Sequence, residues 1–301
     1  MGSPEFALPS LRRLHESQHQ VQAVVSGPDK KRGRGGKKTP TPVKSLALDF
    51  GLPVIEADSM KAPELAQTLS AYRADVFVVV AFKILPPALL RIPRLGAVNL
   101  HASLLPEFRG AAPIHHAVMQ GKSETGCTVF RLNAGVDTGG IIIKTSTPIG
   151  PDETTGEVYQ RLMHQGADAL LEALDAMADG RASYAPQDDT KATKAPKLFE
   201  EHCRLRFDRP AGEVHNHIRG LSPFPTAFAY LDGKKMKLLR SQVLDKQNYP
   251  QPPGTLELLG EKAVLYCSPG RLELGDVKYE GRKQMNAAAF LRGHQGGMRL
   301  E

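Results

Sequence analysis

The stretch Asn99-Leu-His-Ala-Ser-Leu-Leu-Pro-Glu-Phe-Arg-Gly-Ala-Ala-Pro-Ile114 carries two polar side chains suited to catalysis, Asn99 and His101. The run 96–101 has the composition of a strand, and the proline-containing loop after it cannot continue a sheet ladder. Because Asn99 and His101 are two positions apart, a strand that continues to His101 directs both side chains to one face at its carboxyl end. In open α/β sheets, ligands bind at that end.

A second segment, Leu132-Asn-Ala-Gly-Val-Asp-Thr-Gly-Gly140, carries Asp137 in a glycine-rich turn between two apolar runs, 127–132 and 141–143. We expect this turn to bring the carboxylate of Asp137 beside the histidine. An amide, an imidazole and a carboxylate placed together can polarise a carbonyl group and manage a proton, which is what acyl transfer requires.

Length and composition indicate a globular protein of two ordinary domains. The chain has 301 residues, of which 41% are hydrophobic and 24% charged, so each domain can bury a core. No apolar run approaches the roughly 20 residues that span a bilayer, and the first residues lack the pattern of a secretory signal. We therefore expect a cytoplasmic protein that does not enter a membrane.

The three cysteines, Cys127, Cys203 and Cys267, lie far apart in the chain. A disulfide framework and a zinc site both need clustered cysteines, so neither is indicated. We expect Cys127, which falls in a run with strand composition, to be a small buried core residue rather than a nucleophile.

The first half alternates segments typical of strands and helices, which predicts a parallel sheet with crossover helices. Valine-rich runs at 21–26, 75–82 and 97–101 indicate strands, and helices are predicted at 62–72 and 156–178. We expect Gly180 to end the longer helix. Its apolar residues lie largely on one stripe, which consists of Val158, Leu162, Ala169, Leu170, Ala173, Leu174 and Met177.

The composition changes at residues 181–203, where prolines, lysines and small polar residues indicate a linker. Several short strand-like runs between Gly, Pro and Asp-Gly turns follow, which predicts a small barrel or sandwich; these runs are 226–231, 235–242, 254–259, 263–267 and 272–279. The predicted organisation is therefore a first domain at 1–180, the linker 181–203 and a C-terminal β domain at 204–301.

Positive charge is concentrated in two places. Residues 29–44 contain seven Lys or Arg and one Asp, which gives a net charge of +6. Residues 204–301 contain 16 Lys or Arg and 10 acids, which also gives +6. The remainder of the chain carries −5, so the total is +7. The run Lys30-Lys-Arg-Gly-Arg-Gly-Gly-Lys-Lys38 suits contacts with phosphate groups. A basic run by itself is also typical of a solvated surface.

Four blocks resemble, in order and spacing, the signature of the formyltransferases that use 10-formyltetrahydrofolate: Asn-x-His at 99–101, Ser-Leu-Leu-Pro at 103–106, Arg-Gly-Ala-Ala-Pro-Ile at 109–114 and Asp-Thr-Gly at 137–139. Three further segments extend the resemblance over nearly the whole chain, Gly2-Ser-Pro-Glu-Phe-Ala7, Pro42-Val-Lys44 and Ser222-Pro-Phe-Pro225. The resemblance implies an α/β Rossmann-like catalytic domain followed by an OB-like β-barrel.

The same resemblance implies an activity. It is transfer of a formyl group from 10-formyltetrahydrofolate, a diffusing co-substrate, to the α-amino group of methionyl-initiator tRNA for translation initiation. No metal is implied. We further expect a monomer.

Formyl transfer to an amine passes through a tetrahedral intermediate with an oxyanion, so the site needs a hydrogen-bond donor and a proton acceptor. We assign Asn99 as the oxyanion donor and His101 as the residue that shuttles or compensates the proton. Asp137, if within hydrogen-bond distance, would favour the protonated imidazole and fix its tautomer. Whether His101 or a water is the immediate base stays open.

The resemblance places Ser103, Leu104, Leu105 and Pro106 in the folate site, with Val80, Ala81 and Phe82 beside them. Main-chain groups of the first four residues would hydrogen-bond the pterin edge, while the two leucines supply an apolar wall. The segment Ala81-Phe-Lys-Ile-Leu-Pro86 departs from the Ala-Tyr-Gly form that is usual in the family. Arg109 could contact a substrate phosphate or the folate tail, or it could be structural.

The resemblance also directs the basic run to the acceptor-stem region of tRNA. Its candidate contacts are Arg32, Arg34, Lys37 and Lys38, with Arg34 at the position of the Gly-Arg-Gly that the family has. The basic domain at 204–301 would hold the remainder of the tRNA through phosphate contacts, which position the nucleic acid without reading its bases.

One element of the resemblance is missing from the N-terminal sequence. Ser3-Pro4-Glu5 is a good helix start, and the family has a buried strand immediately before it, whereas here Met1 and Gly2 precede it. We expect either that the true start of the protein lies upstream of Met1 or that the first strand has been lost. A lost central strand would leave ladder groups of its neighbours unpaired.

Two other interpretations share some of these features. A formyltransferase acting on glycinamide ribonucleotide or on a nucleotide amino sugar could have the same Asn, His and Asp, but would need neither the basic run nor the basic second domain. A tRNA-binding protein without catalysis is the alternative from another class, and the presence of all three catalytic positions argues against it.

Overall fold

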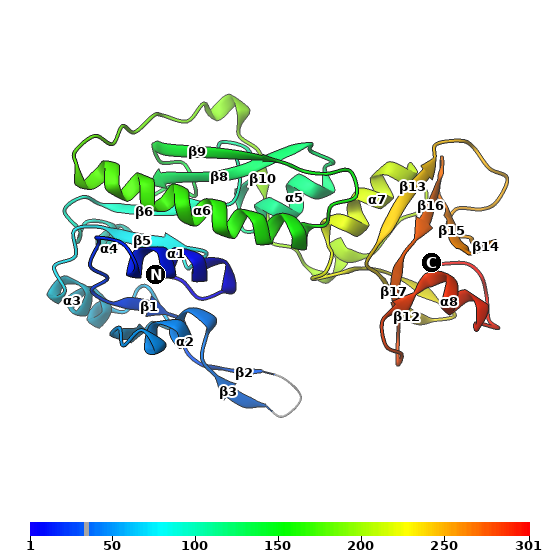
Figure 1. The fold of residues 1–301 in the computed structure, drawn as a ribbon, viewed down its shortest axis with the longest axis horizontal. Helices are drawn as coiled ribbons and strands as arrows, with labels where there is room; N and C mark the ends of the chain where they lie inside the picture. The colour runs from blue at the N-terminus through cyan, green and yellow to red at the C-terminus, as the bar shows by residue number, and fades with distance from the viewer. Residues whose placement is uncertain (33–35) are drawn as a thin grey trace. The chain divides into compact units, whose positions relative to one another are not determined.

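The computed structural model describes residues 1–32 and 36–301, which form two compact units (Figure 1). The first unit comprises Met1–Gly110, Thr125–Thr147 and Tyr159–Lys194, and the second comprises Ala111–Glu124, Pro148–Val158 and Ala195–Glu301. The second unit thus takes two segments from the range predicted as the first domain. One of these segments contains helix α5 (Pro113–Met119), which packs on α7 (Ala211–Gly220).

A four-stranded sheet positions the candidate catalytic residues of the first unit, in the order β5 (Phe77–Val80), β6 (Ala97–His101), β8 (Glu124–Arg131) and β9 (Ile141–Pro148). Strands β5 and β6 are parallel, whereas β6 and β8 are antiparallel. The sheet is therefore mixed, and the prediction of a parallel sheet is wrong for β8. The six central residues of β8 are all buried, and a strand that is buried on both faces carries no sign of its direction in the sequence.

Met1 and Gly2 lie between β5 and a parallel pair formed by β1 (Val24–Ser26) and β4 (Val54–Glu56). The N–H of Gly2 donates to the carbonyl of Val25 at 3.0 Å, and the N–H of Val80 donates to the carbonyl of Met1 at 3.0 Å. These two residues thus stand where the resemblance places a first strand. A Cβ atom on residue 2 would lie 2.9 Å from the oxygen of Val80, so glycine is required there.

A cavity of about 370 Å³ continues along the gap between β1 and β5. Apolar side chains from the strands and from helices α1 (Leu8–His15) and α6 (Thr155–Ala178) line it, among them Leu11, Val24 and Leu174. Its lining does not include Asn99, His101 or Asp137. The cavity is therefore separate from the predicted catalytic residues.

Helix α6 lies along β6 and β8 (Figure 1). The seven apolar residues predicted to form its stripe are all buried, which confirms that prediction. A Cβ on Gly166 would lie 3.0 Å from both Cys127 Sγ and Leu100, so the glycine allows the helix to approach the sheet closely. Burial raises the pKa of the Cys127 thiol to about 12, as expected of a core cysteine.

The remaining elements of the first unit are short. They are the 3₁₀ turns at Glu5–Ala7 and Asp189–Lys191, helices α2 (Pro42–Asp49), α3 (Pro63–Ala71) and α4 (Pro87–Leu90), and strands β2 (Lys30–Arg32), β3 (Lys37–Thr39) and β7 (Arg109–Gly110). The predicted linker is ordered: residues 181–194 lie in the first unit, where Ala185 bridges Ile141. It continues as β10 (Lys194–Ala195) and a 3₁₀ turn at Glu200–Cys203.

Two four-stranded sheets make up most of the second unit, in the orders β11-β12-β17-β18 and β13-β16-β15-β14. The strands are β11 (Ala227–Leu231), β12 (Lys234–Leu238), β13 (Ser241–Asp245), β14 (Leu256–Leu259), β15 (Lys262–Tyr266), β16 (Arg271–Leu274), β17 (Asp276–Tyr279) and β18 (Met285–Asn286). Helix α8 (Ala287–Arg292) follows the last of them.

Two runs predicted as single strands each divide into two, because the chain passes from one sheet to the other within them. The crossings fall between β12 and β13 and between β16 and β17, at Arg240 and Gly275. The N–H of Gly275 donates to the carbonyl of Arg240 at 2.9 Å, and a Cβ on residue 275 would lie 2.9 Å from the Cβ of Arg240. Bends of this kind are how strands switch sheets in orthogonal packings.

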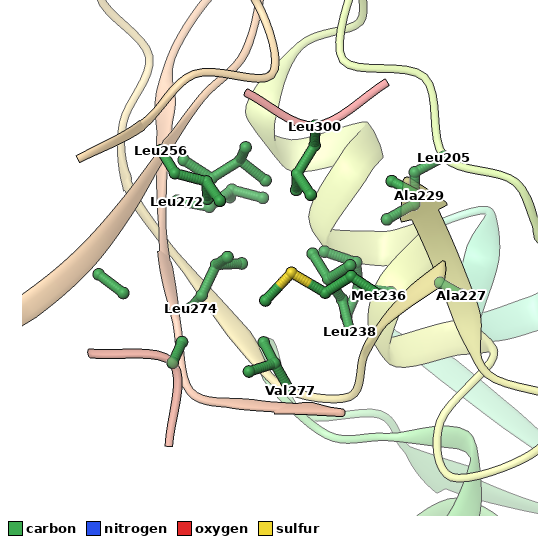
Figure 2. Packing of buried hydrophobic residues seen from close by; sticks show 14 of the residues in the cluster. Leu205, Ala227, Ala229, Met236, Leu238, Leu256, Leu272, Leu274, Val277 and Leu300 are labelled. Carbon is green, nitrogen blue, oxygen red and sulfur yellow. The ribbon is translucent and has the colours of Figure 1, made fainter. Parts of the chain in front are cut away.

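The core of the second unit lies between these sheets and α7 and α8 (Figure 2). Figure 2 shows Met236 and Leu238 from one sheet in the same cluster as Leu272 and Leu274 from the other. All four are at most 2% exposed, so the two sheets share one hydrophobic core. Among the helices formed by the described residues, none is both long enough and apolar enough to cross a membrane.

Helix α7 carries a buried histidine, His215, with a hydrogen-bond partner at each ring nitrogen. The Nε2–H of His215 donates to the carbonyl of Pro151 at 2.9 Å, and Nδ1 lies 2.9 Å from the hydroxyl of Ser241. Burial lowers the pKa of His215, and it also lowers the pKa of His115 and His217. Below the unfolded pKa of about 6.5, the unfolded chain therefore binds protons more readily than the folded chain.

We predict that the second unit loses stability as the pH falls below about 6.5, measured by urea unfolding followed by circular dichroism at pH 7.5 and 5.5. His215→Gln is expected to be less stable at both values, because a buried hydrogen bond is lost, but to show a smaller difference between them. An unchanged pH difference in this variant would contradict the role of His215.

Candidate active site

Asn99 and His101 leave β6 on the same face. Asn99 pairs with Val79 on β5 and with Phe130 on β8, while His101 pairs with Thr128. The alternate residue, Leu100, points to the opposite face, where α6 packs. The strand prediction for 97–101 is confirmed, and its alternation separates the catalytic candidates from the helix-covered core.

Hydrogen bonding determines which ring nitrogen of His101 carries a proton. The ring is buried, and Nε2 lies 2.9 Å from the carbonyl oxygen of Phe108. A carbonyl can only accept, so Nε2–H is the donor and Nδ1 is the basic nitrogen of the neutral ring. Nδ1 lies 3.8 Å from Oδ2 of Asp137, which is too long for a hydrogen bond.

This geometry changes one predicted role. The tautomer of His101 is set by Phe108, not by Asp137, because the carboxylate is beyond hydrogen-bond distance. At 3.8 Å, Nδ1 of His101 and Oδ2 of Asp137 are nonetheless close enough to form an ion pair. The turn does bring Asp137 beside His101, as predicted, although no hydrogen bond joins them.

Asp137 is held by backbone as well as by side-chain contacts. Its φ of 54° lies in the left-handed region, which aspartate tolerates better than most residues. The N–H of Gly110 donates to its Oδ2 at 2.9 Å. Gly139 of the same turn cannot carry a side chain, because a Cβ there would lie 1.6 Å from the carbonyl oxygen of Arg131.

A glutamine from the predicted linker completes this arrangement. The Nε2 of Gln187 donates to the carbonyls of Asp137 and Gly139, both at 2.9 Å. Its Oε1 accepts from Arg109 Nε at 3.1 Å and Nη2 at 2.7 Å. Arg109 also contacts Asp189 at 2.6 Å. Of the roles left open for Arg109, the structure thus favours the structural one.

The side-chain amide of Asn99 is not engaged by the part of the protein that the structure describes. Asn99 is half-buried, and among the described residues none makes a hydrogen bond to its side-chain amide. An amide that is not committed to the protein can donate to a developing oxyanion without first breaking another bond.

The side chain of Thr128 holds the main chain of the Ser103–Pro106 segment by hydrogen bonds. The Thr128 hydroxyl donates to the carbonyl of Ser103 at 2.7 Å and accepts from the N–H of Leu105 at 3.1 Å. The side chains of Ser103 and Leu105 are fully buried. They therefore face the protein, and only Leu104, Pro106 and main-chain groups of this segment are left to meet a ligand.

The end of β5 adjoins this segment. Val80 pairs with Leu100, so its side chain lies on the face opposite Asn99 and lines the cavity beside Met1. This differs from the predicted lining role of Val80, and strand alternation is the reason. Ala81 is exposed with a φ of 47°, and Phe82 is half-buried.

The basic run forms an antiparallel hairpin that projects from the first unit (Figure 1). Its register places Lys31 opposite Lys38 and Arg32 opposite Lys37. Arg34, predicted to contact tRNA, lies outside the described residues. Lys44, at the start of α2, is instead paired with Asp29 at 2.8 Å and with Glu56, so its charge is compensated locally.

Sequence reasoning missed three residues of this site, Phe108, Thr128 and Gln187. None of them belongs to a motif whose spacing predicts its hydrogen bonds. Thr128 and Gln187 bond to residues far away in the sequence, and Phe108 bonds to His101 through its main-chain carbonyl. Gln187 stands in a segment whose composition indicates a linker, and no local signal distinguishes it there.

The amide, imidazole and carboxylate at the end of this sheet are groups that acyl transfer can use. Residues 1–174 match the family model described as formyl transferase, and residues 197–295 match the model described as formyl transferase, C-terminal domain. The chain belongs to the formyl transferase family, with a Rossmann-like N-terminal fold.

Two relatives are similar to this chain over nearly its whole length. A protein of Chlorobium luteolum named methionyl-tRNA formyltransferase is 46% identical over 97% of this chain and 95% of its own length. One of the same name from Trichlorobacter lovleyi is 42% identical over 98% of this chain and 93% of its own length.

The solved structures that resemble the chain show the same fold at low identity. WlaRD, a sugar 3N-formyl transferase solved in the presence of dTDP and 5-N-formyl-THF, gives a TM-score of 0.69 with 15% identity, over 94% of this chain and 97% of that one. The N-formyltransferase of Helicobacter canadensis, in complex with folinic acid and dTDP-3-aminofucose, gives 0.67 with 18% identity, over 91% and 96%.

We predict that Thr128→Val lowers the free energy of unfolding by about 2 kcal/mol, because it leaves a buried N–H and a buried carbonyl without their partner. Thr125→Val is the matched control on the same strand, since the buried hydroxyl of Thr125 has no hydrogen-bond partner among the described residues. Urea unfolding measures both. Equal losses in the two variants would contradict the anchoring role of Thr128.

Proposed function

We propose that this chain transfers the formyl group of 10-formyltetrahydrofolate to the α-amino group of methionyl-initiator tRNA. The observation that carries the proposal is the near full-length identity of 46% to a protein named methionyl-tRNA formyltransferase. The site is compatible with it, because Asn99, His101 and Asp137 lie together at one end of the sheet.

In the proposed reaction, the methionine nitrogen attacks the formyl carbon, a new C–N bond forms, and the bond from that carbon to the folate nitrogen breaks. Asn99 donates to the oxyanion of the tetrahedral intermediate. Nδ1 of His101 takes the proton lost by the amine and returns it to the departing folate nitrogen. Asp137 stabilises the imidazolium that exists between these two steps.

For the folate, we propose a site at the ends of β5 and β6. Leu104, Pro106, Ala81 and Phe82 would supply its walls, and the main chain at residues 103–106 would supply hydrogen bonds. Small-molecule sites are typically apolar with a few placed polar groups. Ser103 and Leu105 would contribute through their main-chain atoms, because their side chains are buried.

For the tRNA, we propose contacts through the hairpin β2–β3. Its two strands carry residues of the basic run 30–38, and Lys30 and Lys38 are exposed. Exposed lysines can neutralise phosphate groups, and the release of counterions from the nucleic acid favours such contacts. Residues 204–301, with a balance of +6, would hold the rest of the tRNA.

Three broader features complete the proposal. The two sheets of the second unit would form a barrel of the OB type, a fold that binds oligonucleotides. The enzyme would work in the cytoplasm, where charged tRNA is found, and as a monomer.

We predict that the purified protein formylates methionyl-initiator tRNA and does not formylate glycinamide ribonucleotide. Asn99→Ala should lower kcat by about 10²- to 10³-fold, as loss of an oxyanion donor does elsewhere. His101→Ala and Asp137→Ala should each lower it by at least about 10²-fold. His19→Ala, which alters a histidine paired with Asp175 away from the site, is the control.

Two results would overturn this proposal. One is formylation of glycinamide ribonucleotide or of a nucleotide amino sugar in place of the tRNA, which would assign the chain to another branch of the family. The other is near-normal turnover in the His101 and Asp137 variants.

We predict that Lys30→Ala/Lys38→Ala weakens tRNA binding and lowers the slope of log Kd against log salt concentration by about 1 to 2, one for each lost phosphate contact. Both lysines are exposed. Filter binding at several salt concentrations measures this effect. Lys61→Ala removes an exposed lysine outside the hairpin and serves as the control. The same salt slope in the double variant and the control would contradict tRNA contact by the hairpin.

A further inference from the structure

Gln187 connects both chain segments that define the surroundings of His101. Its Nε2 donates to the carbonyls of Asp137 and Gly139, and its Oε1 accepts two hydrogen bonds from Arg109. Both ends of the amide are therefore used. The opposite orientation would set NH₂ against a guanidinium and oxygen against two carbonyls, so the partners determine the orientation.

The two segments that Gln187 joins also meet at Asp137. Phe108 supplies the carbonyl that accepts from His101, and Gly110 supplies the N–H that donates to the Asp137 carboxylate. Arg109 lies between them in the sequence, and its guanidinium is bound by Gln187 and by Asp189. Gln187 therefore links, by hydrogen bonds, the segment 108–110 that contacts His101 and Asp137 to the turn that carries Asp137.

The Asp137 turn needs hydrogen bonds from another segment to hold its main-chain conformation. The turn contains three glycines, at positions 135, 139 and 140, which have large conformational freedom in the absence of contacts. Asp137 itself adopts a left-handed conformation with φ of 54°. Hydrogen bonds to two carbonyls of the turn hold the main chain directly at the residue whose carboxylate must face the imidazole.

We propose that Gln187 is a positioning residue that holds the Asp137 carboxylate at its 3.8 Å distance from Nδ1 of His101. It does not touch the reacting atoms and acts through Asp137. The inference rests on the proposed function, because it assigns Asp137 a part in formyl transfer.

The test uses Gln187→Met, which keeps the length of the side chain and removes both hydrogen-bonding ends. Gln187→Glu separates the two ends, because a carboxylate can still accept from Arg109 but repels the two carbonyls. Gln165→Met is the matched control, since the Nε2 of Gln165 donates to the carbonyl of Ser146 on the exposed side of α6.

We expect Gln187→Met and Gln187→Glu to lower kcat for formylation by about 10- to 100-fold, with KM for both substrates within about threefold of wild type. Gln165→Met should retain wild-type values. In a double-mutant cycle, adding Gln187→Met to Asp137→Ala should lower kcat by less than about threefold more, because the positioned group is already gone.

A second readout does not depend on activity. The N–H of Gly110 donates to the Asp137 carboxylate, so its amide signal in a ¹H–¹⁵N spectrum reports the place of that carboxylate. We expect Gln187→Met to shift this signal in the same direction as Asp137→Ala does, and Gln165→Met to leave it in place.

The proposal is overturned if Gln187→Met matches Gln165→Met in kcat, if its loss multiplies fully with that of Asp137→Ala, or if the Gly110 signal stays in place. Failure of the proposed function looks different, because then the wild-type protein itself does not formylate the tRNA. The Gly110 signal still decides in that case whether Gln187 positions Asp137.

Discussion

The hydrogen bond from Nε2 of His101 to the carbonyl of Phe108, at 2.9 Å, is the contact on which the rest of the site depends. It commits one ring nitrogen to the protein and leaves Nδ1 as the basic position, directed toward Asp137. The strand β6 places Asn99 on the same face, two residues earlier. One main-chain carbonyl therefore orients the imidazole that we propose as the proton carrier, while the sheet places Asn99, the proposed oxyanion donor.

The surrounding fold keeps that carbonyl and the carboxylate in place. Thr128 anchors the loop that leads from His101 toward Phe108, and the ordered segment that contains Gln187 anchors both Arg109 and the Asp137 turn. Each anchor is a hydrogen bond between segments distant in the sequence. Precise placement of this kind is what proximity effects in catalysis require.

Local patterns were sufficient to predict β6, the apolar stripe of α6 and the short strands of the second unit, because alternation and helical periodicity record which side chains are buried. They were insufficient for the direction of β8, whose buried run looks the same in either orientation. They also could not show that Val80 faces away from Asn99, that Phe108 sets the tautomer of His101, or that the segment around Gln187 is no free linker. Those facts depend on pairing and long-range hydrogen bonds, which leave no periodic trace in the sequence.

In this structure His101 is held as the Nε2–H tautomer, with Nδ1 as the unprotonated nitrogen. A long-range ¹H–¹⁵N spectrum of protein labelled with ¹⁵N-histidine measures this directly, with the His101 signals assigned by their loss in His101→Gln. We expect the neutral ring to carry its proton on Nε2, and Nδ1 to show the chemical shift of an unprotonated nitrogen. A neutral ring protonated on Nδ1 would rule out the hydrogen bond to Phe108 as the contact that orients His101.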